Sequence, residues 1–119
     1  MLPEISRLEL ETMIRSGAPL SVVEVLPEPY FVSGHLPGAL NLPLSALPTQ
    51  ARSLLPDPDA EVVVYCTGPT CQNSHVAQLA LTGLGYRRVR VFRGGKAEWT
   101  AAGNELVKAA GNELSQVAS

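Results

Sequence analysis

The sequence feature that most constrains the fold is the stretch of residues 62–74. It begins with three valines and a tyrosine, stops at Cys66, and continues through Gly68 and Pro69. The β-branched run fits a strand buried on both faces, and the glycine and proline prevent it from continuing. From Ser74 onward, apolar residues recur at the spacing of one helix face, namely Val76, Ala77, Leu79, Ala80, Leu81 and Leu84. Cys66 is therefore predicted at the carboxyl end of a strand, where loop N–H groups and a helix N-terminus favour an anion such as a thiolate.

Apolar runs and helical segments alternate along the rest of the chain. Ser6 and Glu9 match a capping box, which predicts a helix over residues 7–16 that Gly17 ends. The other expected elements are strands at 21–26, from Leu40 and at 89–92, one helical turn at 30–32, a broken helical connection over 45–55, and helices from Ser74 and from Lys96. This order predicts an α/β fold with a central, mostly parallel sheet covered by helices on both faces. Ligands of such sheets bind at the carboxyl ends of the strands.

Size and charge narrow the classes of function. A chain of 119 residues is long enough for one domain that buries a core without disulfides or metals. A net charge of −2 gives no reason to expect a nucleic-acid or membrane partner. Residues 62–86 carry no charged side chain, but a polar loop divides them into apolar pieces too short to cross a bilayer. Five of the nine basic residues lie within 87–96 and form either a solvated rim or a positive field near an anion site.

The two cysteines, Cys66 and Cys71, lie five positions apart. The start of the chain lacks the apolar segment of a signal peptide, so we expect a cytoplasmic, reducing setting in which both thiols are free. We expect no metal and no cofactor.

His35 and a repeat near the end of the chain are both interpreted as structural features. His35 lies among turn residues without a paired carboxylate, so we expect its ring nitrogens to bond nearby backbone. Residues 101–106 and 109–114 repeat the same pattern, in which a glycine ends one helical turn and an asparagine caps the next. This repeat predicts a short helical C-terminal extension over residues 104–119, to which we assign no function.

Four segments together resemble a known family. Residues 34–41, 63–66, 85–89 and 94–99 occur in the order and at the spacing of a single-domain rhodanese, a thiosulfate:acceptor sulfurtransferase. The resemblance implies a rhodanese-like domain over residues 1–103 with five strands and a catalytic cysteine at Cys66. It also implies that Cys66 carries a persulfide between two half-reactions. A donor such as thiosulfate or another sulfane compound would supply the sulfur, and a thiol, cyanide or a protein would accept it.

The loop after Cys66 has the composition of an anion cradle. The N–H groups of its residues can point at the sulfur and stabilise a thiolate or a persulfide anion. The residues concerned are Thr67, Gly68, Thr70, Cys71, Gln72 and Asn73, together with Pro69, which has no N–H and shapes the loop. Nucleophilic catalysis of this kind requires no neighbouring general base, and none is visible in the sequence.

The sequence departs from the family in three respects. Glu24, Val25 and Leu26 replace an Asp-Val-Arg motif, so an ion pair beside the site is expected to be lost. The loop is two residues longer than usual if Ser74 marks its end. It also contains no arginine or lysine, so Arg93 or Lys96 from the next loop would have to bind the donor. The same absence argues against Cys-x5-Arg phosphatases and arsenate reductases, which need a loop arginine for their oxyanion.

Cys71 leaves two alternatives open. It is either a resolving thiol that traps an oxidised or persulfidated Cys66 as a disulfide, or a small residue packed under the start of the helix. The first alternative supports a second hypothesis for the whole chain, a thiol redox switch or sulfur-sensing module that uses Cys66 and Cys71 without turnover. An inert interaction domain is a third. His75 could lower the pKa of the thiol, but we expect it to face solvent.

Overall fold

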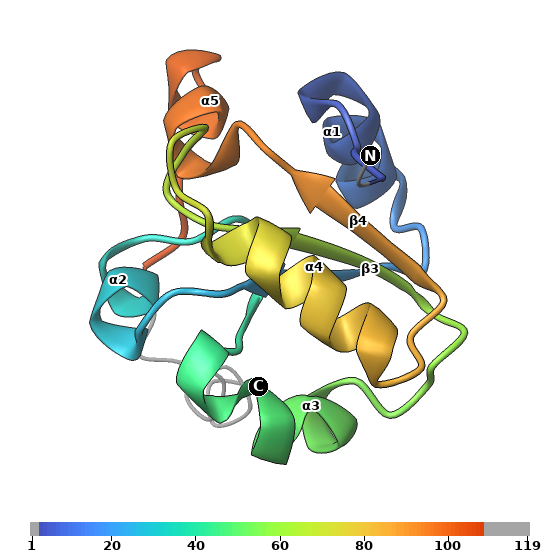
Figure 1. Cartoon of the computed structure of the whole chain (residues 1–119). Helices are drawn as coiled ribbons and strands as arrows, with labels where there is room; N and C mark the ends of the chain where they lie inside the picture. Colours follow the sequence, from blue (N-terminus) through green and yellow to red (C-terminus); the bar gives the residue numbers. More distant parts are fainter. Residues whose placement is uncertain (1–2, 109–119) are drawn as a thin grey trace.

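The computed structural model describes residues 3–108 and has a parallel sheet at its centre (Figure 1). The strands are β1 (Ser21–Glu24), β2 (Leu40–Asn41), β3 (Glu61–Tyr65) and β4 (Arg88–Phe92), in the spatial order β2-β1-β3-β4. Glu24 pairs with Tyr65, and Tyr65 pairs with Phe92. The carboxyl ends of the three longest strands therefore meet at one edge of the sheet.

The sheet has four strands, so the prediction of five was wrong for the part of the chain that the structure describes. In the position next to β4, residues 3–6 form a single bridge, between Glu4 and Val91. The N–H of Val91 donates to the Pro3 carbonyl at 2.9 Å, and the N–H of Ile5 donates to the Val91 carbonyl at 3.0 Å. Pro3 has no N–H to donate and Ser6 already caps the first helix, which leaves too few residues for a ladder.

Helices cover both faces of the sheet, as predicted. They are α1 (Arg7–Ser16), α2 (Glu28–Ser33), α3 (Leu47–Leu54), α4 (Asn73–Gly83) and α5 (Gly95–Ala101), and a short 3-10 turn at Leu44–Ala46 precedes α3. Alternate residues of β3 face opposite ways. Val62 and Val64 pack with residues of α3 and α4, whereas Val63 and Tyr65 pack with residues of α1, α2 and α5. Figure 1 shows α4 lying across the sheet and α5 beside the loop that follows β3.

Local sequence signals account for the bounds of the first helix. The N–H of Glu9 donates to Ser6 Oγ at 3.1 Å, and Gly17 ends the helix with a φ of 71°. That left-handed conformation favours glycine. The capped helix over residues 7–16 is therefore confirmed to the residue. Part of the predicted first strand, Val25 and Leu26, lies beyond the end of β1.

His35 has the structural role that the sequence indicated. It is buried, its Nδ1 lies 2.9 Å from the Phe31 carbonyl oxygen, and its ring stacks on Phe31 with 3.8 Å between centroids. Its backbone forms an antiparallel bridge with Val107. Residues 104–108, at the start of the predicted helical extension, are not helical because Val107 is held in this bridge. The remainder of the extension, residues 109–119, lies outside the described residues.

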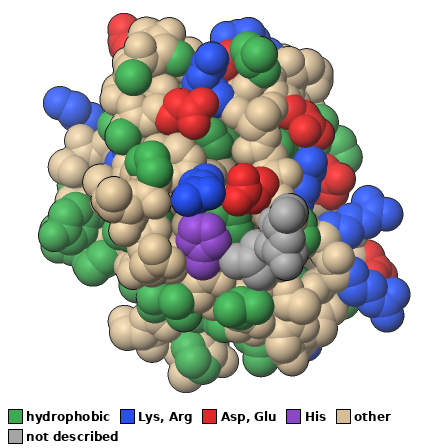
Figure 2. Space-filling view, turned by 45° about the horizontal axis from the view of Figure 1, so that its top comes forward, with side chains coloured by type: hydrophobic (Ala, Val, Ile, Leu, Met, Phe, Trp, Pro, Cys, Tyr) green, Lys and Arg blue, Asp and Glu red, His purple; other side chains and the backbone are tan. Residues whose placement is uncertain are grey.

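Charge on the surface is mixed. Figure 2 shows acidic and basic side chains interspersed over one face. Of the basic residues within 87–96, three are paired: Arg87 with Asp59, Arg90 with Glu9, and Lys96 with Glu24. Because these charges are neutralised by acidic partners, the pairing favours the interpretation of residues 87–96 as a solvated rim over that of a positive field near an anion site. Within residues 3–108, no helix has the length and apolar character needed to span a membrane.

Candidate active site

Cys66 is the first residue after β3 and is 1% exposed. Its thiol lies 3.5 Å from the carbonyl oxygen of Cys71 and 3.5 Å from Oγ of Ser74, which is buried in the first turn of α4. A turn in which the Cys71 N–H donates to the Gly68 carbonyl at 3.1 Å folds the loop back over Cys66. The strand–loop–helix unit predicted from the sequence therefore exists, and it surrounds the Cys66 sulfur.

The two thiols influence each other's pKa. Burial raises the pKa of the Cys66 thiol, and its hydrogen bond to Cys71 raises it further, while the hydroxyl and N–H of Ser74 act in the opposite direction. Burial also raises the pKa of the Cys71 thiol, but the bond from Cys66 and the N–H groups of Asn73 and Thr67 outweigh it, so that this pKa lies below its usual value. The raised pKa favours the protonated thiol of Cys66 at rest, and this thiol can donate to the Cys71 carbonyl oxygen or to Ser74 Oγ.

The loop N–H groups have different surroundings while Cys66 is a resting thiol. Those of Thr67 and Asn73 act on the Cys71 thiol, and the N–H of Cys71 is used in the turn with Gly68. The pKa of the resting Cys66 thiol is raised, because burial and the neighbouring Cys71 outweigh the two groups of Ser74. That Thr67, Cys71 and Asn73 take part in holding a persulfide stays a prediction. That Gly68, Thr70 and Gln72 hold a persulfide, and that Pro69 shapes the loop for it, stays a prediction.

Ser74 is the contact residue that the sequence reasoning missed. It was used only to mark the end of the loop, yet both its side chain and its N–H act on Cys66. A serine that opens a helix directly after a cysteine loop was the available signal, because such a residue has both its hydroxyl and a free N–H to offer.

The first residues of the loop are held by the start of α5. The N–H of Lys96 donates to the Cys66 carbonyl at 3.1 Å, and the N–H of Ala97 donates to the Thr67 carbonyl at 2.9 Å. Gly95 has a φ of 58°, and a Cβ there would overlap the Cys66 carbonyl oxygen. Only glycine fits both the left-handed backbone and the close approach. The Gly94-Gly95 turn is thus required to fix the position of Cys66.

Replacing Gly95 with alanine should therefore destabilise the domain and displace the loop. The left-handed conformation alone costs about 1–2 kcal/mol in the free energy of unfolding, and the overlap with Cys66 adds to that. Gly17→Ala is the matched control, since Gly17 has a φ of 71° but no atom within 4 Å of its would-be Cβ. Denaturant unfolding should show a larger loss for Gly95→Ala than for Gly17→Ala. Equal losses would mean that the approach to Cys66 imposes no constraint.

A buried ionic network adjoins the loop. Glu24, at the end of β1, is fully buried. Its Oε1 accepts a hydrogen bond from the Tyr65 hydroxyl at 2.8 Å, and its Oε2 pairs with Lys96 Nζ at 2.9 Å. Burial raises the pKa of Glu24, and the hydrogen bonds from Lys96 and Tyr65 partly offset this. Burial, together with the Glu24 charge, also raises the pKa of Tyr65. The expected loss of an ion pair beside the site was wrong, because Lys96 supplies the cation from α5.

The two predicted donor-binding residues lie in different surroundings. Lys96 Nζ is bound to Glu24 and also donates to the Tyr30 carbonyl at 2.8 Å, so its charge is already used inside the fold. Arg93 is exposed at the end of β4 and borders a hollow of about 350 Å³ next to Pro69 of the loop. Among the described residues, Arg93 has no ion-pair partner. That Arg93 or Lys96 binds the donor stays a prediction. Of the two residues, Arg93 is the better candidate, because it is exposed and its charge is not used in an ion pair among the described residues.

His75 and Cys71 occupy intermediate positions. Cys71 is partly buried and packs against the core cluster that contains Cys66, which is compatible with both alternatives for this residue. His75 is half-buried instead of facing solvent. Its Nδ1 is shielded and, within residues 3–108, has no hydrogen-bond partner.

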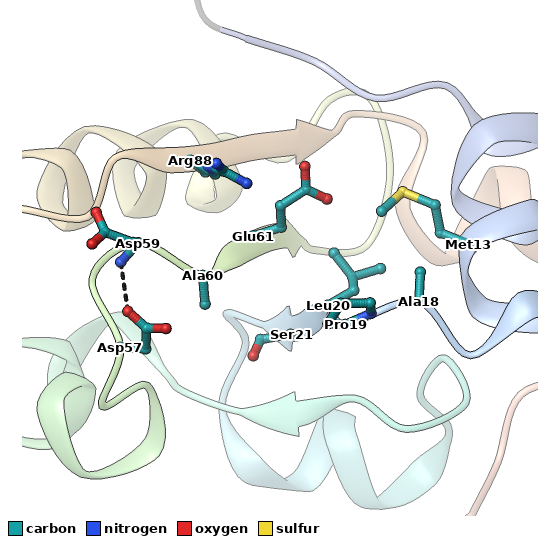
Figure 3. Close-up of a pocket in the computed structure, with 10 residues that line it drawn as sticks. All are labelled: Met13, Ala18, Pro19, Leu20, Ser21, Asp57, Asp59, Ala60, Glu61 and Arg88. Carbon is teal, nitrogen blue, oxygen red and sulfur yellow. Dashed lines mark hydrogen bonds between the residues drawn. The ribbon is translucent and has the colours of Figure 1, made fainter.

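A second hollow, larger than the one beside Arg93, lies at the opposite edge of the sheet. It measures about 430 Å³ and lies between the end of α1 and the amino-terminal ends of the strands (Figure 3). Glu61 and Arg88, the first residues of β3 and β4, line it together with Met13 and Asp57. Cys66 is at the other end of β3, so this hollow takes no part in its chemistry. Within residues 3–108, no cluster of ligands that could hold a metal ion is present.

The fold and the loop define a class of protein, the parallel α/β domains that hold a cysteine at the end of a central strand. Within that class, the chain belongs to the rhodanese-like domain family, which matches residues 6–102. The predicted resemblance is thereby confirmed.

Two curated relatives and one solved structure illustrate the family. An HTH-type transcriptional regulator of Mycobacterium tuberculosis is 33% identical over 99 residues, which make up 83% of this chain but only 42% of the regulator. A sulfurtransferase of Allochromatium vinosum is 29% identical over 107 residues, 90% of this chain and 96% of that protein. The crystal structure of a thiosulfate sulfurtransferase from Pseudomonas aeruginosa superposes with a TM-score of 0.80 at 24% identity, covering 90% of this chain and 20% of the other.

Proposed function

We propose that this protein is a sulfurtransferase that moves a sulfane sulfur through a persulfide on Cys66. The observation that carries the proposal is the position of Cys66 at the end of β3, with the hydroxyl and N–H of Ser74 on its sulfur. Membership of the rhodanese-like family and the sulfurtransferase relative support it. The donor would be a small sulfane compound such as thiosulfate or a polysulfide. The acceptor would be a thiol, cyanide or a protein thiol.

The proposed reaction has two half-reactions. The Cys66 thiolate attacks the outer sulfur of the donor, and sulfite leaves when the donor is thiosulfate. An acceptor then attacks the terminal sulfur of the persulfide and restores Cys66. Cys71 offers a route for the proton that Cys66 must lose, because residue 71 contacts Cys66 Sγ and the pKa of its own thiol is lowered. Ser74 stabilises the negative charge on the sulfur with two donors.

Loading of sulfur onto Cys66 is the direct test. The protein is incubated separately with thiosulfate, a polysulfide and mercaptopyruvate, and its intact mass is measured after desalting. We expect at least one donor to add one sulfur atom, and Cys66→Ser to abolish the adduct. Because the pKa of Cys66 is raised, the thiolate fraction and the loading rate should increase as the pH rises above neutral. A protein that gains sulfur from no donor, or an adduct that survives Cys66→Ser, would refute the proposal.

A second candidate function is a thiol switch that senses sulfur species or oxidants without turnover. The placement of two free cysteines in one loop favours it, since residue 71 contacts Cys66 Sγ and its side chain packs against the cluster that contains Cys66. One relative is a transcriptional regulator, so sensing is a second role worth testing in this family. Free thiols are counted after mild peroxide treatment and again after reduction. A switch predicts reversible loss of both thiols with negligible transfer to cyanide, and two persistent free thiols would exclude it.

A further inference from the structure

Cys71 forms no bond in either of the two proposed half-reactions. The turn between Gly68 and Cys71 brings residue 71 back over Cys66, so that the Cys71 carbonyl oxygen lies 3.5 Å from Cys66 Sγ. The Cys71 side chain packs against the core cluster that contains Cys66. Cys66 is buried, whereas Cys71 is partly exposed. The loop thus contains an inner thiol that can carry sulfur and, on a residue in contact with it, an outer thiol that reaches solvent.

We propose that Cys71 resolves the Cys66 persulfide, releasing hydrosulfide and leaving a Cys66–Cys71 disulfide that an external dithiol reduces. This inference rests on the proposed function, because it needs sulfur on Cys66. It specifies that function further, since it makes a dithiol reductant the final electron donor and hydrosulfide the product.

The resolving step balances without any oxidant. The Cys71 thiolate attacks Cys66 Sγ, and a new bond forms between the two Sγ atoms. The bond from Cys66 Sγ to the terminal sulfur breaks, and its electron pair leaves with that sulfur. The two cysteines are oxidised to a disulfide while the sulfane sulfur is reduced to sulfide. The dithiol then opens the disulfide by exchange and becomes oxidised itself.

The shared proton completes the balance. It lies on Cys66 at rest and moves to Cys71 when Cys66 attacks the donor. When Cys71 in turn becomes the nucleophile, the proton passes to the terminal sulfur, which departs as hydrosulfide. The N–H groups of Thr67 and Asn73 favour this step, because they stabilise the thiolate form of Cys71.

The geometry also selects the sulfur that is attacked. The Cys71 carbonyl oxygen lies 3.5 Å from Cys66 Sγ, so residue 71 is already placed against the atom that becomes the inner sulfur of the persulfide. Attack on the inner sulfur forms the disulfide, whereas attack on the terminal sulfur would merely move it to Cys71. Hydrosulfide is also a better leaving group than a cysteine thiolate, since a thiol of lower pKa leaves faster.

The experiment compares the wild-type chain with Cys71→Ser after loading. Each protein is loaded with thiosulfate or polysulfide, desalted to remove the donor, and incubated without any thiol. Hydrosulfide and intact mass are then followed over time. We expect the wild-type adduct to lose its sulfur, to release one hydrosulfide per chain and to end as a Cys66–Cys71 disulfide located by peptide mapping. Cys71→Ser should keep its sulfur at least tenfold longer and release it when dithiothreitol is added.

Two controls separate this step from general damage to the loop. Val76→Ala changes an exposed position in the first turn of α4 and should release hydrosulfide as the wild type does. Cys71→Ala serves as a second variant if the serine variant does not fold.

The outcomes distinguish the two proposals. If wild type and variants take up no sulfur, the proposed function fails, and this inference fails with it. If all of them load but the wild-type adduct is stable, or if Cys71→Ser releases hydrosulfide as fast as the wild type, the resolving role of Cys71 is refuted while the persulfide stands.

Discussion

Replacing Cys66 with serine is expected to lower the rate of sulfur transfer from thiosulfate or polysulfide to cyanide by on the order of a millionfold, the scale seen when an enzyme loses its nucleophile. A serine hydroxyl is far less acidic than a thiol, so the groups that contact this position, Ser74 and Cys71, would not convert it into an effective nucleophile. The measurement is thiocyanate formation at saturating donor. It extends the loading test to complete turnover.

Correct folding must be shown for this variant. Cys66 belongs to a buried apolar cluster, so serine should cost about 1–3 kcal/mol for a poorly bonded buried hydroxyl. Thermal unfolding and circular dichroism verify that the domain is still folded at the assay temperature. Transfer at more than one hundredth of the wild-type rate would show that Cys66 is not the sulfur carrier.

Replacing Lys96 with methionine is expected to lower the free energy of unfolding by about 3–5 kcal/mol, the cost of breaking a buried ion pair from one side. The Glu24 carboxylate, which is 0% exposed, would lose its countercharge and keep only the Tyr65 hydroxyl. Since domains of this size are stable by about 5–15 kcal/mol, the effect is a large part of the total. Urea unfolding at neutral pH provides the measurement.

Two comparisons make this result specific to the pair. Glu24→Gln combined with Lys96→Met should be more stable than Lys96→Met alone, because no unpaired carboxylate remains. Lowering the pH should also reduce the loss in the free energy of unfolding that Lys96→Met shows relative to the wild type. The pKa of Glu24 is already raised by burial, so the folded variant takes up a proton at a pH where the unfolded chain remains ionised, and its stability increases as the pH falls. A deficit below about 1 kcal/mol at neutral pH would place the pair with weak surface salt bridges.

Features set by neighbouring residues could be predicted from the sequence. The cap at Ser6 and the left-handed Gly17 bound α1 as expected, and the valine run ended at Cys66 as a strand. His35 bonds to Phe31, four residues earlier, which is within the reach of local reasoning. These predictions succeeded because backbone geometry and side-chain chemistry within a few residues determine the outcome.

Features set by distant contacts could not be predicted in the same way. Glu24 and Lys96 are far apart in the sequence, and only the parallel pairing of β1 with β3 brings Glu24 next to Tyr65. The departure from the family motif at Glu24–Leu26 therefore indicated a missing ion pair, although another element supplies the cation. The direction of the loop N–H groups depends on the turn at Gly68 and Cys71, which composition alone does not specify. The fifth strand was inferred from the family, and Pro3 and Ser6 limit it to one bridge here.

The attachment of the Cys66 loop to α5 affects how the protein is made. During synthesis, Cys66 leaves the ribosome before Gly95, Lys96 and Ala97, and until these residues follow, the carbonyl groups of Cys66 and Thr67 lack their donors. Glu24 likewise has no countercharge until Lys96 of the same segment has been synthesised. The Cys66 loop can thus take its final position only after the segment from Gly95 to Ala97 has been translated. A nascent chain that ends before Gly95 therefore lacks both the donors that hold the Cys66 loop and the cation that pairs with Glu24.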